Sequence, residues 1–383
     1  MLNVAVLLPG STMYPTIGFD FNDGLKSCVQ YYQAENNFSF YYEQAGFGSN
    51  QKELYSKVES ILLQKQVQVV VAYIEFRMAE LLQPLFEGMN KLLVVVNAGA
   101  NVPNPAKHYP NMILLSTEDA FHCYLTGKMA VDSNTEGIMC ASYYDAGYKH
   151  CSSMTGGFMN NSGSIIFNSV SPLKLKEFNL KSLTNYITEN NKYDAVLLCI
   201  FSAEYAGLFL NELGKNEIAD RLTLYLSPML LEEALQKNIT SAVPYKTAKG
   251  FTAWISTLEN MENKIFKEAF IQNSQRQPNR FAVLGWEAAL LLEVVEKFIQ
   301  ANNSPTVAEI TTHLNNITLQ GPRGRLKFNN GVSRAPVYEV KLENPFLPVL
   351  VKEISLNEEE QDAFYKKPAD QIESGWYNTF LCA

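Results

Sequence analysis

The side chains that most often carry catalysis or bind metals are scattered in this sequence. The histidines are His108, His122, His150 and His313, and the cysteines are Cys28, Cys123, Cys140, Cys151, Cys199 and Cys382. The cysteines form no CxxC pair, and we interpret most of them as buried thiols. The G-x-S-x-G, G-x-x-x-x-G-K-[ST], G-x-G-x-x-G and H-E-x-x-H motifs are all missing. We therefore expect no metal, no cofactor and no catalytic residue, and we interpret His150 as a surface histidine.

A run of small residues indicates a different kind of chemistry. In VVVNAGANVPNP, Val94 to Pro105, an apolar strand is followed by Asn97, Ala98, Gly99, Ala100 and Asn101 and then by two prolines. A doubly wound fold would ordinarily start a helix there. Small side chains leave backbone N–H and C=O groups free to meet a ligand, so this loop is a candidate ligand contact. The alternative is that Gly99 and the prolines only make a tight connection.

The elements that must position such loops alternate between short apolar runs and segments of helical period. This alternation predicts βαβ units and parallel sheets. The predicted strands are Val4 to Leu8, Phe38 to Glu43, Val67 to Ala72, Leu92 to Val96, Gly137 to Ser142, Ser164 to Asn168, Ala195 to Ile200 and Thr223 to Leu226. The glycine-rich run Met154 to Phe158 is expected within or just after a helix, as close packing or a break.

The strands divide into two groups of four, which predicts two doubly wound α/β lobes. Ser116 and Thr117 before acidic residues give a helix N-cap signal, and a helix is expected from Phe121 to Val131. A long helix from Asn279 to Gln300 is too large to be an appendage of the second lobe, so a return crossing is expected near Gly250. Parallel sheets bind ligands outside the carboxyl ends of their strands, which would line a cleft between the lobes.

Composition and charge exclude several classes of partner. The chain has 383 residues, of which 47% are hydrophobic and 18% charged, and its net charge is -8. Basic clusters are short, so nucleic acid is excluded as the main partner. No apolar run reaches the roughly 18 residues that span a bilayer, so direct membrane insertion is not expected. A strand directly follows Met1, and the protein is either cytoplasmic or a mature form from which a signal peptide has been removed.

Seven stretches, taken in order, resemble type I periplasmic binding proteins of the branched-chain amino acid (leucine/isoleucine/valine) type, the solute receptors of ABC transporters. They are VAVLLPGSTMYPTIGFDFNDGLKSCVQYY, VVVAYIEFRMAE, VVVNAGANVPNP, YYDAGYKH, TAKGFTAW, GWEAALLLEVV and GPRGRLKFNNGVSRAPVYEVKL. The resemblance implies two Rossmann-like lobes joined by a hinge with several crossings. It assigns residues 1–117 and 252–330 to the N-terminal lobe, and residues 118–251 and 331–383 to the C-terminal lobe.

The resemblance also implies where the ligand is bound. The family closes its two lobes over a small amphiphile, whose carboxylate and ammonium meet hydroxyls, backbone groups and one acidic side chain. Carried over to this sequence, the contacts are Tyr14, Tyr73, Glu75, Phe76, Arg77, Asn97, Ala98, Gly99, Ala100, Asn101, Tyr148, Phe201, Ser202, Ser227 and Pro228. The aromatic members predict an aromatic-walled pocket that suits a flat or apolar ligand body, although any one of them could instead belong to the core.

Two positions depart from the family pattern. Glu75-Phe76-Arg77 replaces the small hydroxyl residues that usually hold the ligand carboxylate, and no carboxylate stands at Ser227 to Met229. Glu75 could then bind the ammonium and Arg77 could clamp the carboxylate. The alternative is that both are solvated residues opening the next helix.

These features predict an extracytoplasmic solute-binding protein that captures an amino acid or a related aromatic or aliphatic carboxylate or amide by hinge closure. Its expected partner is the permease of an ABC transporter in the bacterial envelope, and its expected location is the periplasm. A ligand-sensing receptor domain of the same fold and an α/β enzyme with an unrecognised site are the alternatives. The closing acidic tail carries aromatic residues, which predict that it packs back on a lobe.

Overall fold

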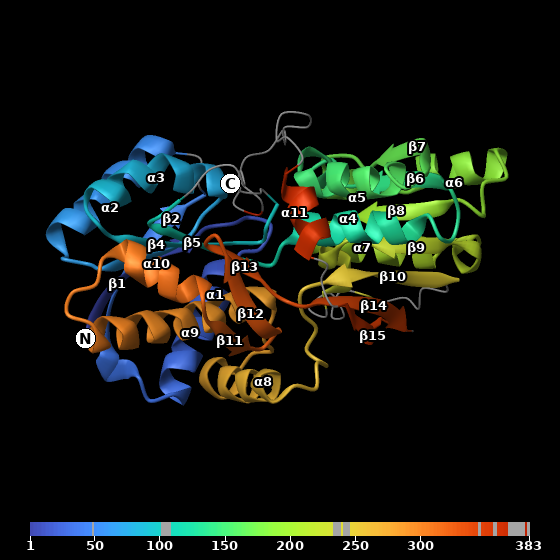
Figure 1. Cartoon of the computed structure of the whole chain (residues 1–383). Coiled ribbons are helices and arrows are strands. Elements are labelled where there is room, and N and C mark those ends of the chain that lie inside the picture. The colour runs from blue at the N-terminus through green and yellow to red at the C-terminus, as the bar shows by residue number, and fades with distance from the viewer. Residues whose placement is uncertain are drawn as a thin grey trace. The chain divides into compact units, whose positions relative to one another are not determined.

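The computed structural model divides the chain into two compact units, each built on its own sheet (Figure 1). It describes residues 1–47, 50–100, 109–232, 239, 246–343, 346–354, 358–366 and 380. Unit 1 takes Met1–Thr117, Leu258–Pro336 and, from the end of the chain, Phe380. Unit 2 takes Glu118–Thr257 and the described residues from Val337 to Lys366. The predicted α/β class is confirmed.

The sheet of unit 1 has the strand order β11-β12-β13-β5-β4-β3-β1-β2, in which β1 to β5 are parallel. Its elements are β1 (Leu2–Pro9), α1 (Ile17–Tyr31), η1 (Glu35–Asn37), β2 (Phe38–Gly46), α2 (Gln51–Gln64), β3 (Val69–Tyr73), α3 (Phe76–Gly88), β4 (Leu92–Asn97), β5 (Met112–Ser116), α8 (Met261–Ser274), α9 (Arg280–Ala301), α10 (Val307–Asn315), β11 (Thr318–Gly321), β12 (Gly324–Asn329) and β13 (Val332–Arg334).

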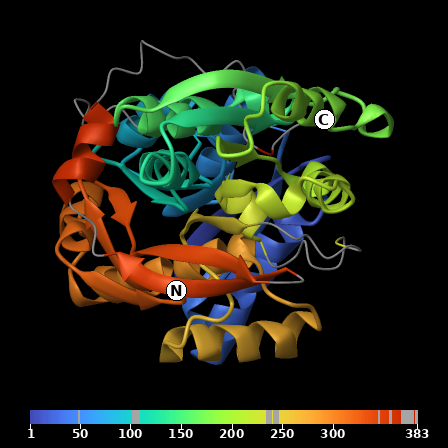
Figure 2. The same ribbon diagram turned by 90° about the vertical axis from the view of Figure 1, so that its right-hand side faces the viewer.

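The sheet of unit 2 has the order β15-β14-β10-β9-β8-β6-β7. Its elements are α4 (Asp119–Ala130), β6 (Glu136–Ala141), η2 (Asp145–Gly147), α5 (Lys149–Met159), β7 (Ser164–Val170), η3 (Leu175–Glu177), α6 (Lys181–Glu189), β8 (Val196–Ile200), α7 (Ala203–Gly214), η4 (Ala219–Arg221), β9 (Thr223–Leu226), η5 (Pro228–Leu231), β10 (Thr247–Thr252), β14 (Val337–Glu343), β15 (Leu347–Ile354) and α11 (Glu358–Lys366). The antiparallel pair β14 and β15 is the long red-orange ribbon of Figure 2.

All eight predicted strands are present, and β5 is a strand that the sequence analysis did not assign. The unit boundaries also differ from the expected ones. The chain returns to unit 1 at Leu258 and leaves it again after Pro336, because β13 pairs with β12 and β5 and so stays in unit 1. The predicted cap of α4 is wrong, since Glu118 is the N-cap residue and the Thr117 hydroxyl donates to the Ala98 carbonyl.

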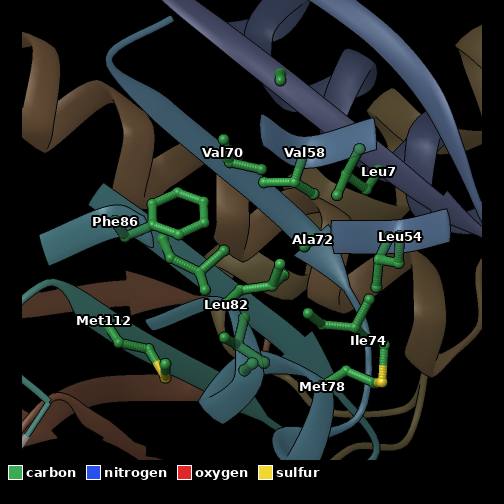
Figure 3. Close-up of a cluster of buried hydrophobic side chains, with 14 of the residues drawn as sticks. Leu7, Leu54, Val58, Val70, Ala72, Ile74, Met78, Leu82, Phe86 and Met112 are labelled. Carbon is green, nitrogen blue, oxygen red and sulfur yellow. The ribbon is translucent and has the colours of Figure 1, made fainter. Parts of the chain in front are cut away.

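Unit 1 buries one face of its sheet under α2 and α3 (Figure 3). Leu54 and Val58 of α2 and Leu82 and Phe86 of α3 pack on alternate residues of the strands, such as Val70. The alternation follows from the two-residue period of a strand, and the other set of strand side chains lies on the opposite face, where α1 and α9 contact the sheet. Both faces are therefore apolar, as parallel sheets require.

In unit 2, glycines bring α4 and α5 into backbone contact. A Cβ placed on Gly157 would lie 2.0 Å from the Tyr124 carbonyl oxygen, and one placed on Gly127 would lie 1.9 Å from the Met154 oxygen. The glycine-rich run is thus close packing inside a continuous α5 rather than a break. The tight α4–α5 pair fixes α5, whose first residue follows the loop after β6.

Gly157→Ala should destabilise the protein by about 1–3 kcal/mol, because the added methyl group meets backbone that cannot rotate away. The matched control is Gly156→Ala, where the new methyl has only the Asn160 side chain at 4.0 Å; this change should be neutral or stabilise α5 by about 0.5–1 kcal/mol. Urea unfolding measures both. Equal effects at the two positions would contradict the close helix contact.

Candidate functional site

Each sheet has one point at which the strand order reverses. In unit 1 the chain runs from β1 to β2 on one side and returns to β3 on the other, so the reversal lies between β1 and β3. In unit 2 it lies between β6 and β8 for the same reason. Ligands of open α/β sheets bind beyond the carboxyl ends of the strands at such points. The loops after these four strands are therefore the first places to look for a site.

The loop after β1 carries Tyr14 into an aromatic cluster of unit 1. The Tyr14 ring meets Phe281 edge to face at 5.2 Å between centroids and Phe380 at 4.9 Å. Tyr73, the last residue of β3, lies 6.4 Å from Phe281, and the Arg280 guanidinium lies 5.0 Å from the rings of Phe281 and Phe380. The aromatic cluster, Tyr14, Tyr73, Arg280, Phe281 and Phe380, thus joins two sequence-predicted residues to three that were not predicted.

The first turn of α9 is held against the loop after β1 by hydrogen bonds. Asn279 caps α9 by accepting from the backbone N–H groups of Phe281 and Ala282, and it donates to Asp20 Oδ2 at 2.8 Å. Thr16 donates to the same Asp20 oxygen at 2.8 Å. Because Asp20 is buried in α1, this network fixes Tyr14 and Phe281 relative to each other.

Two backbone groups of the loop after β4 form hydrogen bonds within unit 1. The Asn97 side chain accepts from Gly99 N–H at 2.9 Å, and Ala98 C=O accepts from the Thr117 hydroxyl at 3.0 Å. The expectation that these two groups are free for a ligand is therefore wrong, because the Asn97 amide and the Thr117 hydroxyl engage them. Ala98 and Ala100 are buried, and Gly99 has φ +78°, which glycine adopts without strain. Asn101 lies outside the described residues.

The loop after β3 leads directly into α3. Glu75 is the N-cap residue of α3 and is buried, so it is not the solvated residue of the alternative interpretation. Phe76 belongs to the apolar core and packs edge to face on Tyr109 at 5.2 Å. Arg77 is half-buried. Of these three residues, Glu75 and Arg77 carry polar groups at the edge of the β1–β3 reversal.

In unit 2 a buried carboxylate organises the β6–β8 reversal. Asp145 Oδ2 accepts from the Ser142 hydroxyl at 2.6 Å and from Ser202 N–H at 2.9 Å, and Oδ1 accepts from the Ser202 hydroxyl at 2.6 Å. Complete burial raises the Asp145 pKa to about 6, although the hydrogen bonds from Ser142 and Ser202 oppose this shift. Asp145 thus ties the loop after β6 to the loop after β8.

The same loop positions Tyr148 at the start of α5. Tyr148 is buried, its hydroxyl donates to the Tyr144 hydroxyl, and the two rings meet edge to face. The Tyr148 ring lies 5.9 Å from the His150 ring. His150 is buried on α5, so the prediction of a surface histidine is wrong. The short helix η2, Asp145–Gly147, directly precedes Tyr148 and α5.

The last three predicted residues lie after β8 and β9. Phe201 stacks on Phe209 at 4.3 Å in the core of unit 2, which is the alternative left open for each aromatic. Pro228 opens the short helix η5 and is buried. Ser227 is also buried, and its hydroxyl has no hydrogen-bond partner among the described residues. A buried hydroxyl without a partner is costly, so this atom is where a ligand atom could gain most.

Metal and thiol chemistry find no support in the described residues. No group of three or more histidine, cysteine or acidic side chains among them could hold a metal ion. Four described cysteines are buried, as predicted, and burial raises the thiol pKa of Cys28 and Cys199. None of the helices in the described part of the chain has the length and apolarity that crossing a bilayer requires.

Sequence reasoning missed Asp145 and Arg280. Asp145 stands in the quoted run YYDAGYKH, and the spacing from Ser142 to Asp145 is the kind of local hydroxyl–carboxylate turn that could have shown it. Arg280 left a weaker signal: a basic residue directly after a capping asparagine, on the apolar side of a long helix. Two of its aromatic neighbours, Tyr14 and Phe380, come from distant segments and could not be read from the sequence.

The sequence matches a family model described as periplasmic binding protein over residues 2–343. The chain belongs to this family. A comparison with curated protein sequences gave no match. The match ends before β15, α11 and Phe380.

Solved structures share the fold of this periplasmic binding protein at low sequence identity. An ABC-transporter solute-binding protein of R. palustris in complex with benzoate has 19% identity and a TM-score of 0.73, over 93% of this chain and 98% of that one. An ABC-transporter substrate-binding protein of Sphaerobacter thermophilus has 16% identity and a TM-score of 0.77, over 92% of this chain and 97% of that one. A branched-chain amino acid transporter substrate-binding protein of Streptococcus pneumoniae in complex with isoleucine has 13% identity and a TM-score of 0.68, over 93% of this chain and 99% of that one.

Asp145 should make the protein less stable as the pH rises from about 4 to about 6. Its pKa is raised in the folded state, so the folded protein holds a proton that the unfolded chain has already released. The two-unit difference corresponds to about 3 kcal/mol. Unfolding by urea between pH 4 and 7 should show this slope in the wild type and not in Asp145→Asn. The exposed control Asp194→Asn should keep the slope; its loss there would refute the assignment.

Proposed function

We propose that this protein is an extracytoplasmic solute-binding protein that captures a small ligand and delivers it to an ABC transporter. The observation that carries the proposal is the family match over residues 2–343, together with a loop cluster at the strand-order reversal of each sheet. Ligand contacts from both units would favour a closed arrangement of the protein by differential affinity. The periplasmic location follows from the family and is part of the proposal.

The proposed ligand is an amino acid or a related aromatic or aliphatic carboxylate or amide. Neighbouring structures contain benzoate and isoleucine, which are both small and carry a carboxylate beside an apolar body. In this chain Arg280 and Arg77 supply guanidinium groups in unit 1, and guanidinium is the side-chain group that best matches a carboxylate. The aromatic rings of Tyr14 and Tyr73 suit the apolar body.

Unit 2 supports a ligand with little or no positive charge. Asp145, a carboxylate at the strand-order reversal, already accepts three hydrogen bonds from Ser142 and Ser202. Ser227 stands where the family resemblance implies the acidic partner of an ammonium group. A neutral hydroxyl there favours an acid or an amide over a zwitterion, which leaves Glu75 of unit 1 as the candidate ammonium partner.

The first test is a thermal-shift panel of amino acids, small aromatic acids, amides and short peptides. A ligand that binds only the folded protein raises the unfolding midpoint by mass action, and at a hundred times its Kd it adds about 2.7 kcal/mol of stability. We expect one chemical class to raise the midpoint and to be recovered unchanged after incubation. Chemical conversion of the ligand would overturn the assignment as a binding protein.

Ser227→Ala should separate ligand binding from folding. Removing a buried hydroxyl that has no described partner should leave the ligand-free protein as stable as the wild type, or more stable by about 1 kcal/mol. The ligand found in the panel should bind roughly 3- to 10-fold more weakly, the value of one hydrogen bond.

The matched control for this variant is Ser202→Ala. Its hydroxyl donates to Asp145 at 2.6 Å, so the same atom change should destabilise the ligand-free protein. Titration calorimetry measures affinity and urea unfolding measures stability. If Ser227→Ala loses stability and keeps full affinity, the hydroxyl has a structural role and the position leaves the site.

A further inference from the structure

The aromatic cluster of unit 1 holds a ring from the far end of the chain. Phe380 is completely buried and meets Tyr14 edge to face at 4.9 Å, a favourable aromatic geometry. It lies 6.4 Å from Phe281, and the Arg280 guanidinium stands 5.0 Å from its centroid. The described neighbours of this ring thus include two aromatic side chains and a cation.

The backbone of Phe380 indicates that these contacts hold it in place. Its φ is +64°, in the left-handed region that a bulky residue without a glycine's freedom rarely adopts. Such a conformation persists only where surrounding contacts outweigh its cost. Phe380 also lies 37 residues beyond the end of the family match at residue 343. Phe380 therefore lies outside the matched region.

The cluster sits where unit 1 should meet a ligand. Tyr14 follows β1, Tyr73 ends β3, and the strand order reverses between these two strands. The rings of Tyr73 and Phe281 are 6.4 Å apart, which links the cluster to the carboxyl end of β3. Phe380 thus occupies a place next to the two strand ends at which an open α/β sheet binds its ligand.

We propose that Tyr14, Phe281 and Arg280 form a subsite for an aromatic carboxylate, and that the Phe380 ring occupies this subsite when no ligand is bound. The inference rests on the proposed function and names its ligand class. The aromatic faces and edges of Tyr14 and Phe281 receive the ligand ring as they now receive Phe380. The Arg280 guanidinium, which lies 5.0 Å from the ring of Phe380, pairs with the carboxylate of the ligand.

Because Phe380 is part of the chain, it competes with the ligand at a fixed local concentration. The apparent Kd of a ligand is its intrinsic Kd divided by the fraction of molecules whose site is open. A subsite filled by Phe380 in nine molecules of ten would weaken binding about tenfold. The competition applies to ligands that carry a ring, and much less to ligands that leave the subsite empty.

The test compares benzoate and isoleucine binding to the wild type, Phe380→Ala and Phe380→Leu by titration calorimetry. Benzoate should bind Phe380→Ala about tenfold more tightly, and Phe380→Leu should lie between this variant and the wild type. Isoleucine binding, where present, should change much less. The control Phe298→Ala removes a different ring contact of α9, the stacking on His313 at 4.4 Å, and should leave both Kd values unchanged.

Three outcomes overturn the inference in distinguishable ways. Equal or weaker benzoate binding to both Phe380 variants would mean that Phe380 is a fixed part of the site or lies outside it, while the binding function stands. Tighter binding of isoleucine by the same factor would mean that Phe380 excludes all ligands rather than a ring. Binding of neither compound to the wild type or to any variant removes the aromatic-acid subsite, and a negative thermal-shift panel would then remove the proposed function as well.

Arg280 is tested by the preference between benzoate and its neutral isostere benzamide. In the Phe380→Ala background the protein should prefer benzoate, and Arg280→Gln should reduce that preference at least tenfold while benzamide binding changes little. The ratio of the two Kd values is insensitive to a general loss of folded protein. An unchanged ratio would show that Arg280 supports the aromatic rings and does not bind the carboxylate.

Discussion

A buried ion pair and its hydrogen bond to Ser116 join two chain segments of unit 1. Arg323 donates to both oxygens of Glu287, at 2.6 to 3.1 Å, and to the Ser116 carbonyl at 2.9 Å, and both side chains are almost fully buried. These contacts join α9, the β11–β12 turn and the carboxyl end of β5. Removing one partner of a buried pair costs about 3–5 kcal/mol, because a charge is left without compensation. The pair thus anchors α9 to the sheet of unit 1 at the carboxyl end of β5.

The Arg323–Glu287 pair also determines where the first turn of α9 lies. Glu287 and Arg280 are seven residues apart, which is two helical turns, so both lie on the same side of α9. Gly285 lets α9 approach α1 closely, since a Cβ there would lie 1.9 Å from the Phe21 oxygen. With α9 fixed by a salt bridge and by backbone contact, Arg280 and Phe281 have little freedom to move. A subsite built on a rigid helix is already organised before ligand arrives.

The sequence predicted the strands well and the site only in part, for physical reasons. Alternation of apolar runs and helices is a local signal, and it located the carboxyl ends of β1, β3 and β6 to within one residue. The unit boundaries depend on pairing between distant strands, such as β13 with β5, which no local pattern reports. Phe201 and Tyr14 looked equivalent in the sequence, yet one stacks in the core and the other meets α9. Arg323 belongs to a short basic cluster, Arg323 to Arg325, and nothing near it in the sequence indicates its buried partner, which is 36 residues away.

The strand-order reversals of the two sheets carry different kinds of side chain. At the strand-order reversal of unit 2, the buried carboxylate of Asp145 accepts hydrogen bonds from Ser142 and Ser202. The buried Ser227 hydroxyl has no hydrogen-bond partner among the described residues. In unit 1 the reversal is lined by aromatic rings and a guanidinium. Taken unit by unit, the rings and the guanidinium of unit 1 suit an aromatic acid, and the buried Ser227 hydroxyl of unit 2 suits a hydrogen-bonding group, as the proposed function requires.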